Sequence, residues 1–355
     1  MLRDELLQRR QEIRDVHGRG LAGAQVSAKF ASLLDSLIMR LFDTTLASSS
    51  AKSDELRSQL AVVCLGSHGR RQCSPYSDVD LMFLYKTLRG EQVAEILRPL
   101  TQGVFDIGLQ LGSSIRKPAE AAQLARTDAV ICTSLIDARL LVGSRPLFDE
   151  FRTGFEKMVR KNSKTLCKIF LDARKQERDQ YGDSVYLLEP HVKRSRGGLR
   201  DLNLLRWLGF AEFGESDPDR LHLLGALSKF DHHRLQSASE FLLRLRNEMH
   251  FQAGNSADML DRAEQLRVAE WLGFQQRSGL LPVEQFMRDY FRHTNHVWQL
   301  VRRREASLET RSAASRVLDP LFTKTIDGMV RVGPSTISLT PAGIAKVKSD
   351  LSEVL

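Results

Sequence analysis

The feature that most constrains this chain is a glycine-serine turn, which is separated by ten residues from two aspartates at the start of an apolar run. The turn is Gly66 and Ser67, the aspartates are Asp78 and Asp80, and the apolar run covers 79–85. Side chains two residues apart on a strand project from the same face. We therefore predict a strand over 79–85 with both carboxylates directed to one side, close enough to share divalent ions.

Two carboxylates that face one way repel each other unless cations lie between them. One or two Mg²⁺ ions, bound by carboxylates and by substrate phosphates, remove that repulsion and stabilise the attacking and leaving oxygens of a phosphoryl transfer. Gly66 lacks a Cβ, so backbone amides can approach a triphosphate there, and Ser67 adds a hydroxyl donor. Arg70 is close enough in sequence to neutralise a pyrophosphate leaving group. An isolated Asp-x-Asp pattern is usually a pair of loop-edge or capping acids, and it is the upstream turn that favours a phosphate site here.

This arrangement resembles the nucleotidyltransferase fold shared with DNA polymerase β, in which a hydrophobic residue, a glycine, a glycine or serine and a spacer precede two acids on a strand. That superfamily takes a third carboxylate from a neighbouring strand. Asp106 begins the next strand-like run and is the first choice for this role, and Asp137 is the alternative. Each also has a purely structural explanation, because an acid can cap a turn or pair with an arginine.

Several segments along the chain are similar to the bacterial protein-PII uridylyltransferase family. The most specific of them reads Gly-Gly-Leu-Arg-Asp, because the two-acid motif is common to many nucleotidyltransferases. The similar segments are Gly66–Arg70 with Ser77–Tyr85, Asp106–Arg116, Thr133–Gly143, Glu189–Lys193 with Gly197–Leu202, and Glu284–Tyr290.

The resemblance implies a Mg²⁺-dependent transfer of UMP from UTP to a tyrosine hydroxyl of the nitrogen regulatory protein PII, with release of pyrophosphate. Carried over by motif, Gly66 and Ser67 would hold the triphosphate. Asp78 and Asp80 would bind the metal. No residue visibly reads a base, so UTP as the nucleotide rests on the resemblance alone.

A second basic cluster, Lys193, Arg194, Arg196 and Arg200, surrounds the Gly-Gly pair. Charge runs are usually solvated, but two adjacent glycines favour a tight, closely packed turn. We therefore take Lys193 and Arg200 as candidate nucleotide-binding residues that reach the phosphates from the helical part of the chain.

The expected fold class is α+β, with a polymerase β-like nucleotidyltransferase α/β core followed by a mostly helical domain. Residues 26–41 have the spacing of an amphipathic helix, and the stretch Thr44–Ser53, rich in Ser, Thr and Ala, is expected to be a loop. We expect an N-terminal helical segment 1–50, a nucleotidyltransferase domain 51–147, a helical domain 148–310, and a tail 311–355 with a hairpin around Gly333–Pro334 and a final helix.

Composition sets limits on partners and location. The 355-residue chain carries a net charge of +8, which suits a nucleotide, a nucleic acid or an acidic protein, but its aromatic residues are only 7% and form no stripe with basic ones. Four irregularly spaced cysteines, no signal peptide and no run of eighteen apolar residues predict a reduced, cytoplasmic protein without a membrane partner. We expect UTP and PII as partners, and not nucleic acid.

The chain departs from the family at the turn, where the family often has Gly-Gly in place of Gly66-Ser67, and in two further places. It has Gly112-Ser113-Ser114 where the family tends to have Gly-His-Ser, and it lacks the adjacent His-Asp pair of the family's uridylyl-removing hydrolase domain. We expect neither that hydrolysis nor glutamine sensing through ACT domains. Two rival functions remain: a nucleotide-binding regulatory module that no longer turns over, and an RNA nucleotidyltransferase of the CCA-adding or polyadenylating kind.

Overall fold

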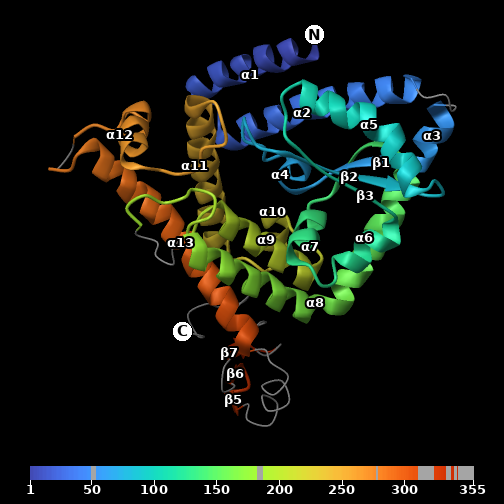
Figure 1. The fold of residues 1–355 in the computed structure, drawn as a ribbon. Helices are drawn as coiled ribbons and strands as arrows, with labels where there is room; N and C mark the ends of the chain where they lie inside the picture. Colours follow the sequence, from blue (N-terminus) through green and yellow to red (C-terminus); the bar gives the residue numbers. More distant parts are fainter. Residues whose placement is uncertain are drawn as a thin grey trace. The chain divides into compact units, whose positions relative to one another are not determined.

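The computed structural model describes residues 1–48, 53–181, 187–276, 279–310, 324–332, 337–339 and 342. The chain forms two compact units, 1–298 and 299–355. The first unit begins with three helices and continues into alternating strands and helices (Figure 1). These elements are α1 (Leu2–Gly18), α2 (Gly23–Ser48), α3 (Ser53–Gln59), β1 (Leu60–Cys64), α4 (Gly66–Gly69), β2 (Val79–Tyr85), α5 (Gly90–Asp106), β3 (Leu111–Arg116), α6 (Pro118–Leu124), α7 (Ala129–Ile136) and β4 (Arg139–Gly143).

A four-stranded mixed sheet with the order β3-β2-β1-β4 organises the first half of this unit. Strand β1 is antiparallel to both β2 and β4, whereas β2 is parallel to β3. The strand predicted over 79–85 is therefore confirmed as β2. Every residue of β1 is buried, because the strand has neighbours on both sides and helices over both faces of the sheet.

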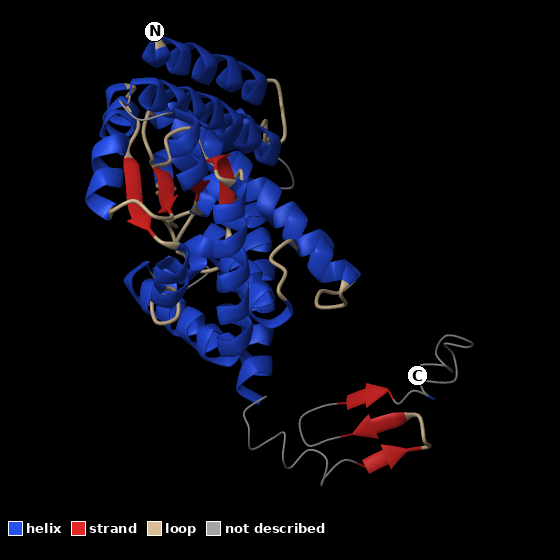
Figure 2. Cartoon of the chain, turned by 90° about the vertical axis from the view of Figure 1, so that its right-hand side faces the viewer, coloured by secondary structure: helices blue, strands red, loops and turns tan. Residues whose placement is uncertain are grey.

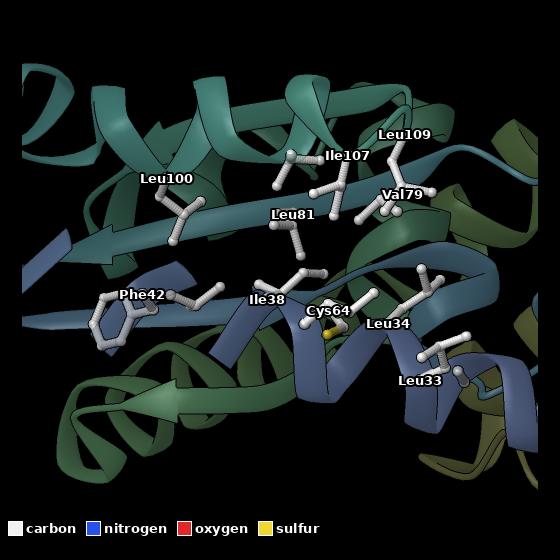
Figure 3. Packing of buried hydrophobic residues seen from close by; sticks show 14 of the residues in the cluster. Leu33, Leu34, Ile38, Phe42, Cys64, Val79, Leu81, Leu100, Ile107 and Leu109 are labelled. Atoms are coloured by element: carbon white, nitrogen blue, oxygen red, sulfur yellow. The ribbon is translucent and has the colours of Figure 1, made fainter. Parts of the chain in front are cut away.

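Helices α2 and α5 pack on one face of the sheet, and α8 (Arg145–Tyr181) packs on the other. Figure 3 shows Leu34 and Ile38 of α2 and Leu100 of α5 close to Val79 and Leu81 of β2. All five side chains belong to one buried hydrophobic cluster. The N-terminal helices thus share a core with the sheet, and burial of this apolar surface is the main force that holds them together.

Helix α2 contains the amphipathic helix predicted over 26–41, but it continues to Ser48. The prediction of a loop from Thr44 is wrong for Thr44–Ser48. The reason is that Phe42 and Leu46 extend the apolar stripe by another turn, and both are almost fully buried. Residues 49–52 lie outside the described part of the chain, and α3 begins at Ser53.

The second half of the first unit is helical (Figure 2). Its elements are α8, α9 (Leu199–Phe213), α10 (Pro218–Leu223), α11 (Lys229–Ala253), α12 (Arg262–Trp271) and α13 (Pro282–Thr310), of which α13 runs on into the second unit. The apolar stripe of α11 belongs to the core, since all of its members are buried: Leu235, Ala238, Leu242, Leu245 and Met249. Helix α8 starts at Arg145, close to the domain boundary expected between residues 147 and 148. That boundary stays a prediction.

The second unit contains the end of α13 and the strands β5 (Lys324–Ile326), β6 (Val330–Val332) and β7 (Ile337–Leu339). These strands form an antiparallel sheet in sequence order, with Val330 opposite Leu339. The predicted turn at Gly333–Pro334 and the predicted final helix lie outside the described residues.

All four cysteines are buried and unpaired. Among the described residues, no helix combines the length and the apolar character that crossing a bilayer would require.

Candidate active site

A polar cavity of about 440 Å³ lies where the turn after β1 and the start of β2 meet the helical half of the first unit. The sheet half contributes Gly66, Ser67, Arg70, Asp78 and Asp80 to its lining, among others. The helical half contributes Lys193, Arg200, Trp207, Arg246 and Asp258, among others. Of the residues predicted for the site, all line this one cavity except the two candidates for the third acid, Asp106 and its alternative Asp137.

The glycine-serine turn begins the four-residue helix α4, directly after β1. Gly66 has a φ of 52°, in the left-handed region that favours glycine, and a Cβ there would lie 3.5 Å from Asp80 Oδ2. At the other end of α4, a Cβ on Gly69 would lie 2.0 Å from the Asp137 carbonyl oxygen. Only glycine permits that approach, so the turn is packed tightly against the sheet half with Ser67 facing the cavity.

The paired acids occupy the edge of the cavity where β2 begins. Asp80 is on β2 and Asp78 immediately precedes it. Enclosure by the cavity walls, and then the charge of Asp78, raise the pKa of Asp80 above its usual value. Among the described residues, neither carboxylate has an ion-pair partner within 4.0 Å. Two neighbouring carboxylates without an ion-pair partner at that distance fit a bound cation, so these oxygen donors suit a divalent metal ion.

Strand β3 offers no third carboxylate beside Asp80. The residue opposite Asp80 is Gly112, and a Cβ on it would lie 2.6 Å from Asp80 Oδ1. The Asp80 carboxylate therefore occupies the space that a side chain at position 112 would need.

Asp106 does not begin a strand, so that prediction is wrong. It is the last residue of α5, its side chain is exposed, and it accepts a hydrogen bond from Gln102 Nε2 at 2.8 Å. It is absent from the cavity lining. The apolar run that follows Val104 supplies the end of an amphipathic helix, whose buried face includes Val104, and the strand starts only at Leu111.

Asp137, the alternative third acid, supports the cavity from behind. Its side chain is 1% exposed and forms an ion pair with Arg70, which does line the cavity. It also accepts a hydrogen bond from Trp207 Nε1 at 3.4 Å. Asp137 thus has the structural role considered above, that of an acid paired with an arginine. Its carboxylate orients the Arg70 guanidinium toward the cavity.

The loop that carries Lys193 is held by a buried ion pair. Arg174 Nε donates to Asp201 at 2.6 Å, and the Gly197 amide donates to the other oxygen of the same carboxylate at 2.6 Å. Gly197 has a φ of 75°, and a Cβ on it would lie 2.0 Å from the Thr294 carbonyl oxygen. The tight turn expected from the Gly-Gly pair is present, and it fixes the backbone from which Lys193 enters the cavity.

Lys193 has no ion-pair partner among the described residues and faces the cavity. Burial lowers the pKa of its ammonium group to about 8, and the charges of Arg246 and Arg200 add to that effect. The amine is therefore still mostly protonated at pH 7. A buried cation without a partner is costly, and an anionic phosphate would relieve that cost.

Arg246 of α11 is a functional candidate that the sequence did not reveal. It forms a bidentate ion pair with Asp258, with distances of 2.6 and 3.1 Å, and it donates to Ser74 Oγ at 3.2 Å. His250 Nε2 is 3.0 Å from the same carboxylate. Burial favours the neutral form of Asp258, but His250 and Arg246 outweigh it and lower the pKa of Asp258. The pair connects α11 to the loop just before the paired acids.

A second group of possible metal ligands, Asp35, Cys64 and His68, lies behind the turn. All three are buried. None of them lines the cavity.

Comparison with known proteins accords with this geometry. The family model of GlnD PII-uridylyltransferase matches residues 168–303, and that of nucleotidyltransferase DUF294 matches residues 8–114. The bifunctional uridylyltransferase/uridylyl-removing enzyme of Erythrobacter litoralis (strain HTCC2594) is 33% identical over 302 residues. The match covers 84% of this chain and 32% of that relative, so this chain spans about a third of the relative's length. The chain is therefore a nucleotidyltransferase that is similar to the PII-uridylyltransferases over most of its own length.

Proposed function

We propose that this protein transfers UMP from UTP to a tyrosine hydroxyl of the nitrogen regulatory protein PII, with Mg²⁺ as the metal and pyrophosphate as the leaving group. The observation that carries the proposal is the distribution of charge in the cavity. Two unpaired acids lie on the sheet side, and Lys193 and Arg200 lie on the helical side. A triphosphate with bound Mg²⁺ carries the charges that match both walls.

Different residues of the cavity would bind the metal, the triphosphate and the leaving pyrophosphate. Asp78 and Asp80 would hold Mg²⁺, which supplies charge stabilisation to the reacting phosphate. The turn at Gly66 offers backbone amides and Ser67 a hydroxyl to the triphosphate, at the beginning of α4. Arg70 is held in place by Asp137 and is available for the leaving pyrophosphate.

On the opposite wall, Lys193 and Arg200 neutralise phosphate oxygens as negative charge builds up on the leaving group. Fixed positions matter as much as charge, because a triphosphate held by both walls presents its α-phosphorus to an acceptor hydroxyl without further reorganisation. The acceptor oxygen bonds to that phosphorus, the bond to the β-phosphate oxygen breaks, and the hydroxyl proton goes to solvent.

The choice of UTP and PII is supported by the family description and by the relative's name. We place the reaction in the cytoplasm, which accords with four cysteines that remain unpaired.

A direct test incubates the chain with UTP, Mg²⁺ and PII, and follows the mass of PII. We expect a gain of one UMP per modified tyrosine. Asp80→Asn should slow the reaction by about a hundred- to a thousandfold, because it removes a charge that acts on the transition state. If PII gains no mass, or if Asp80→Asn is as active as the wild type, the proposal is wrong.

One observation favours a second function, that of a nucleotide-binding module that does not turn over. Gly112 stands beside Asp80 on β3, so the described sheet supplies two carboxylates to the cavity and not three. Calorimetry with UTP and Mg²⁺, combined with a pyrophosphate assay in the presence of PII, separates the two functions. Binding without pyrophosphate release would establish the module.

A further inference from the structure

A buried group of polar side chains lies directly behind the turn, outside the lining of the cavity. Asp35 of α2 is 2.8 Å from His68 Nε2, and the Cys64 thiol is 3.9 Å from the same carboxylate oxygen. Asp35 also accepts hydrogen bonds from Arg139 at 2.9 Å and from Arg71 at 3.1 Å. His68 is fully buried, and its Nδ1 has no hydrogen-bond partner among the described residues. The polar contacts of the imidazole are both at Nε2, where Asp35 is the closer partner and Cys64 Sγ lies at 3.6 Å.

The spacing of Asp35, Cys64 and His68 would accommodate a metal ion, but the surrounding charges do not favour one. Arg71 and Arg139 already place two guanidinium groups on Asp35, and these would repel a dication. His68 Nε2 must carry a proton to donate to Asp35, so that atom is not free to bind a metal. Burial raises the pKa of the Cys64 thiol, whereas metal binding requires the thiolate.

The same group holds the turn at several points. His68 is in α4, next to Ser67. Arg71, two residues after α4, has a φ of 59°, which is uncommon for a residue with a Cβ, and Asp35 binds its side chain. Arg139 of β4 donates to the His68 carbonyl oxygen at 3.3 Å. Asp35 thus joins α4 to α2 and to β4 through one carboxylate.

We propose that Asp35 is a positioning residue, which through His68 and two arginines holds the phosphate-binding turn in its binding geometry. The inference rests on the proposed function, because it assumes that the cavity binds UTP. Hydrogen bonds to a buried carboxylate are stronger than neutral ones. Asparagine at this position keeps the size of the side chain but loses the charge that both arginines require.

The test compares Asp35→Asn with a matched control, Asp43→Asn, on the same helix. Asp43 is exposed, and among the described residues its one ion pair is a surface contact with Arg57. We expect Asp35→Asn to weaken binding of UTP with Mg²⁺ by about ten- to a hundredfold in calorimetry, well below its unfolding temperature. Asp43→Asn should bind as the wild type does. In the transfer assay, Asp35→Asn should lower kcat/KM for UTP and leave KM for PII unchanged, a split that general loss of structure would not produce.

Unchanged UTP affinity in Asp35→Asn overturns the inference. Failure of the wild type to bind UTP contradicts the proposed function itself, and this inference with it. Failure of the positioning role and failure of the proposed function are therefore distinguishable.

A second pair of variants tests the positioning role even if Asp35→Asn does not fold. His68→Gln keeps an N–H donor near the position of Nε2 and should retain most of the UTP affinity, whereas His68→Leu removes the donor and should lose it. Elemental analysis of the wild type should find no tightly bound transition metal. One bound metal per chain that both His68 variants lose would show a metal site and overturn the positioning role.

Discussion

At the residue scale, the sheet leaves very little room around Asp80. Gly112 lies opposite Asp80 on the neighbouring strand β3, and Gly66 of the turn lies close to the Asp80 carboxylate. Burial, and then the charge of Asp78, raise the pKa of Asp80, an effect that a bound cation would reverse. The position of one carboxylate therefore depends on two residues that have no side chain.

Gly112→Ala tests this dependence. The added Cβ would lie 2.6 Å from Asp80 Oδ1, so the carboxylate must move, while the contact involves the end of a side chain and not backbone. We expect a loss of kcat of about a hundredfold, because a misplaced charge stabilises the transition state poorly, with only a small change in thermal stability. Enzyme assays and thermal unfolding of the same preparation provide the check. Wild-type kcat in Gly112→Ala would contradict the placement of Asp80.

Lys193 gives a pH prediction. The pKa of its ammonium group is lowered to about 8, so the group is charged below pH 8 and loses its charge as the pH rises through that value. UTP affinity should fall between pH 7 and pH 9, and above pH 8 binding should take up a proton because the phosphate restores the charged form. Lys193→Arg stays protonated and should lack both effects. Calorimetry in buffers of different ionisation enthalpy measures the proton uptake, and a pH-independent wild type would refute the prediction.

Sequence reasoning at this scale located residues of the cavity where the signal was local. Gly66, Ser67, Asp78 and Asp80 lie within fifteen residues, and all four line the cavity. Asp106 failed because a short apolar run does not distinguish the end of a helix from a strand. Arg246 was hidden in the apolar stripe of α11, and Ser74, one of its partners, is 172 residues away.

At the element scale, the question is how α11 is joined to the loop before β2. The Arg246 and Asp258 side chains are 7% and 9% exposed, and Arg246 also reaches Ser74. A buried ion pair of this kind adds little net stability over an apolar pair, but removal of one partner leaves a buried charge unpaired. Its role is to fix the position of the loop that presents the acids.

Asp258→Ala should lower the free energy of unfolding by about 3–5 kcal/mol, because it leaves Arg246 without its partner. The double variant with Arg246→Met should recover part of that stability, since no buried charge is left. Urea denaturation of the two single variants and the double variant measures the coupling. If the two effects simply add, the pair does not act as a unit.

The elements themselves were predictable to the extent that periodicity reports burial. β1, β2, α2 and α11 each present a clear apolar face, and each is present. Helix α2 ran beyond its predicted end because Ser, Thr and Ala near a C-terminus resemble a loop, while two large apolar residues continue the buried stripe. The end of α2 is therefore set by burial of its apolar side chains and not by the helix propensity of its last residues.

At the scale of the whole molecule, the cavity belongs to neither half of the first unit alone. The sheet half brings the acids and the turn, and the helical half brings most of the cations, so the proposed reaction needs both. The two matched family models follow the same division, with one on residues 8–114 and the other on 168–303. The net charge of +8 needs no nucleic acid to explain it, because several of the positive charges face this cavity.

A structure of the protein with Mg²⁺ and a non-hydrolysable UTP analogue tests the central claim most directly. The account predicts that the triphosphate lies in this cavity between Ser67 and Lys193, with Mg²⁺ bound by Asp78 and Asp80. A nucleotide bound elsewhere, or a triphosphate in the cavity with no metal on the two acids, would contradict it.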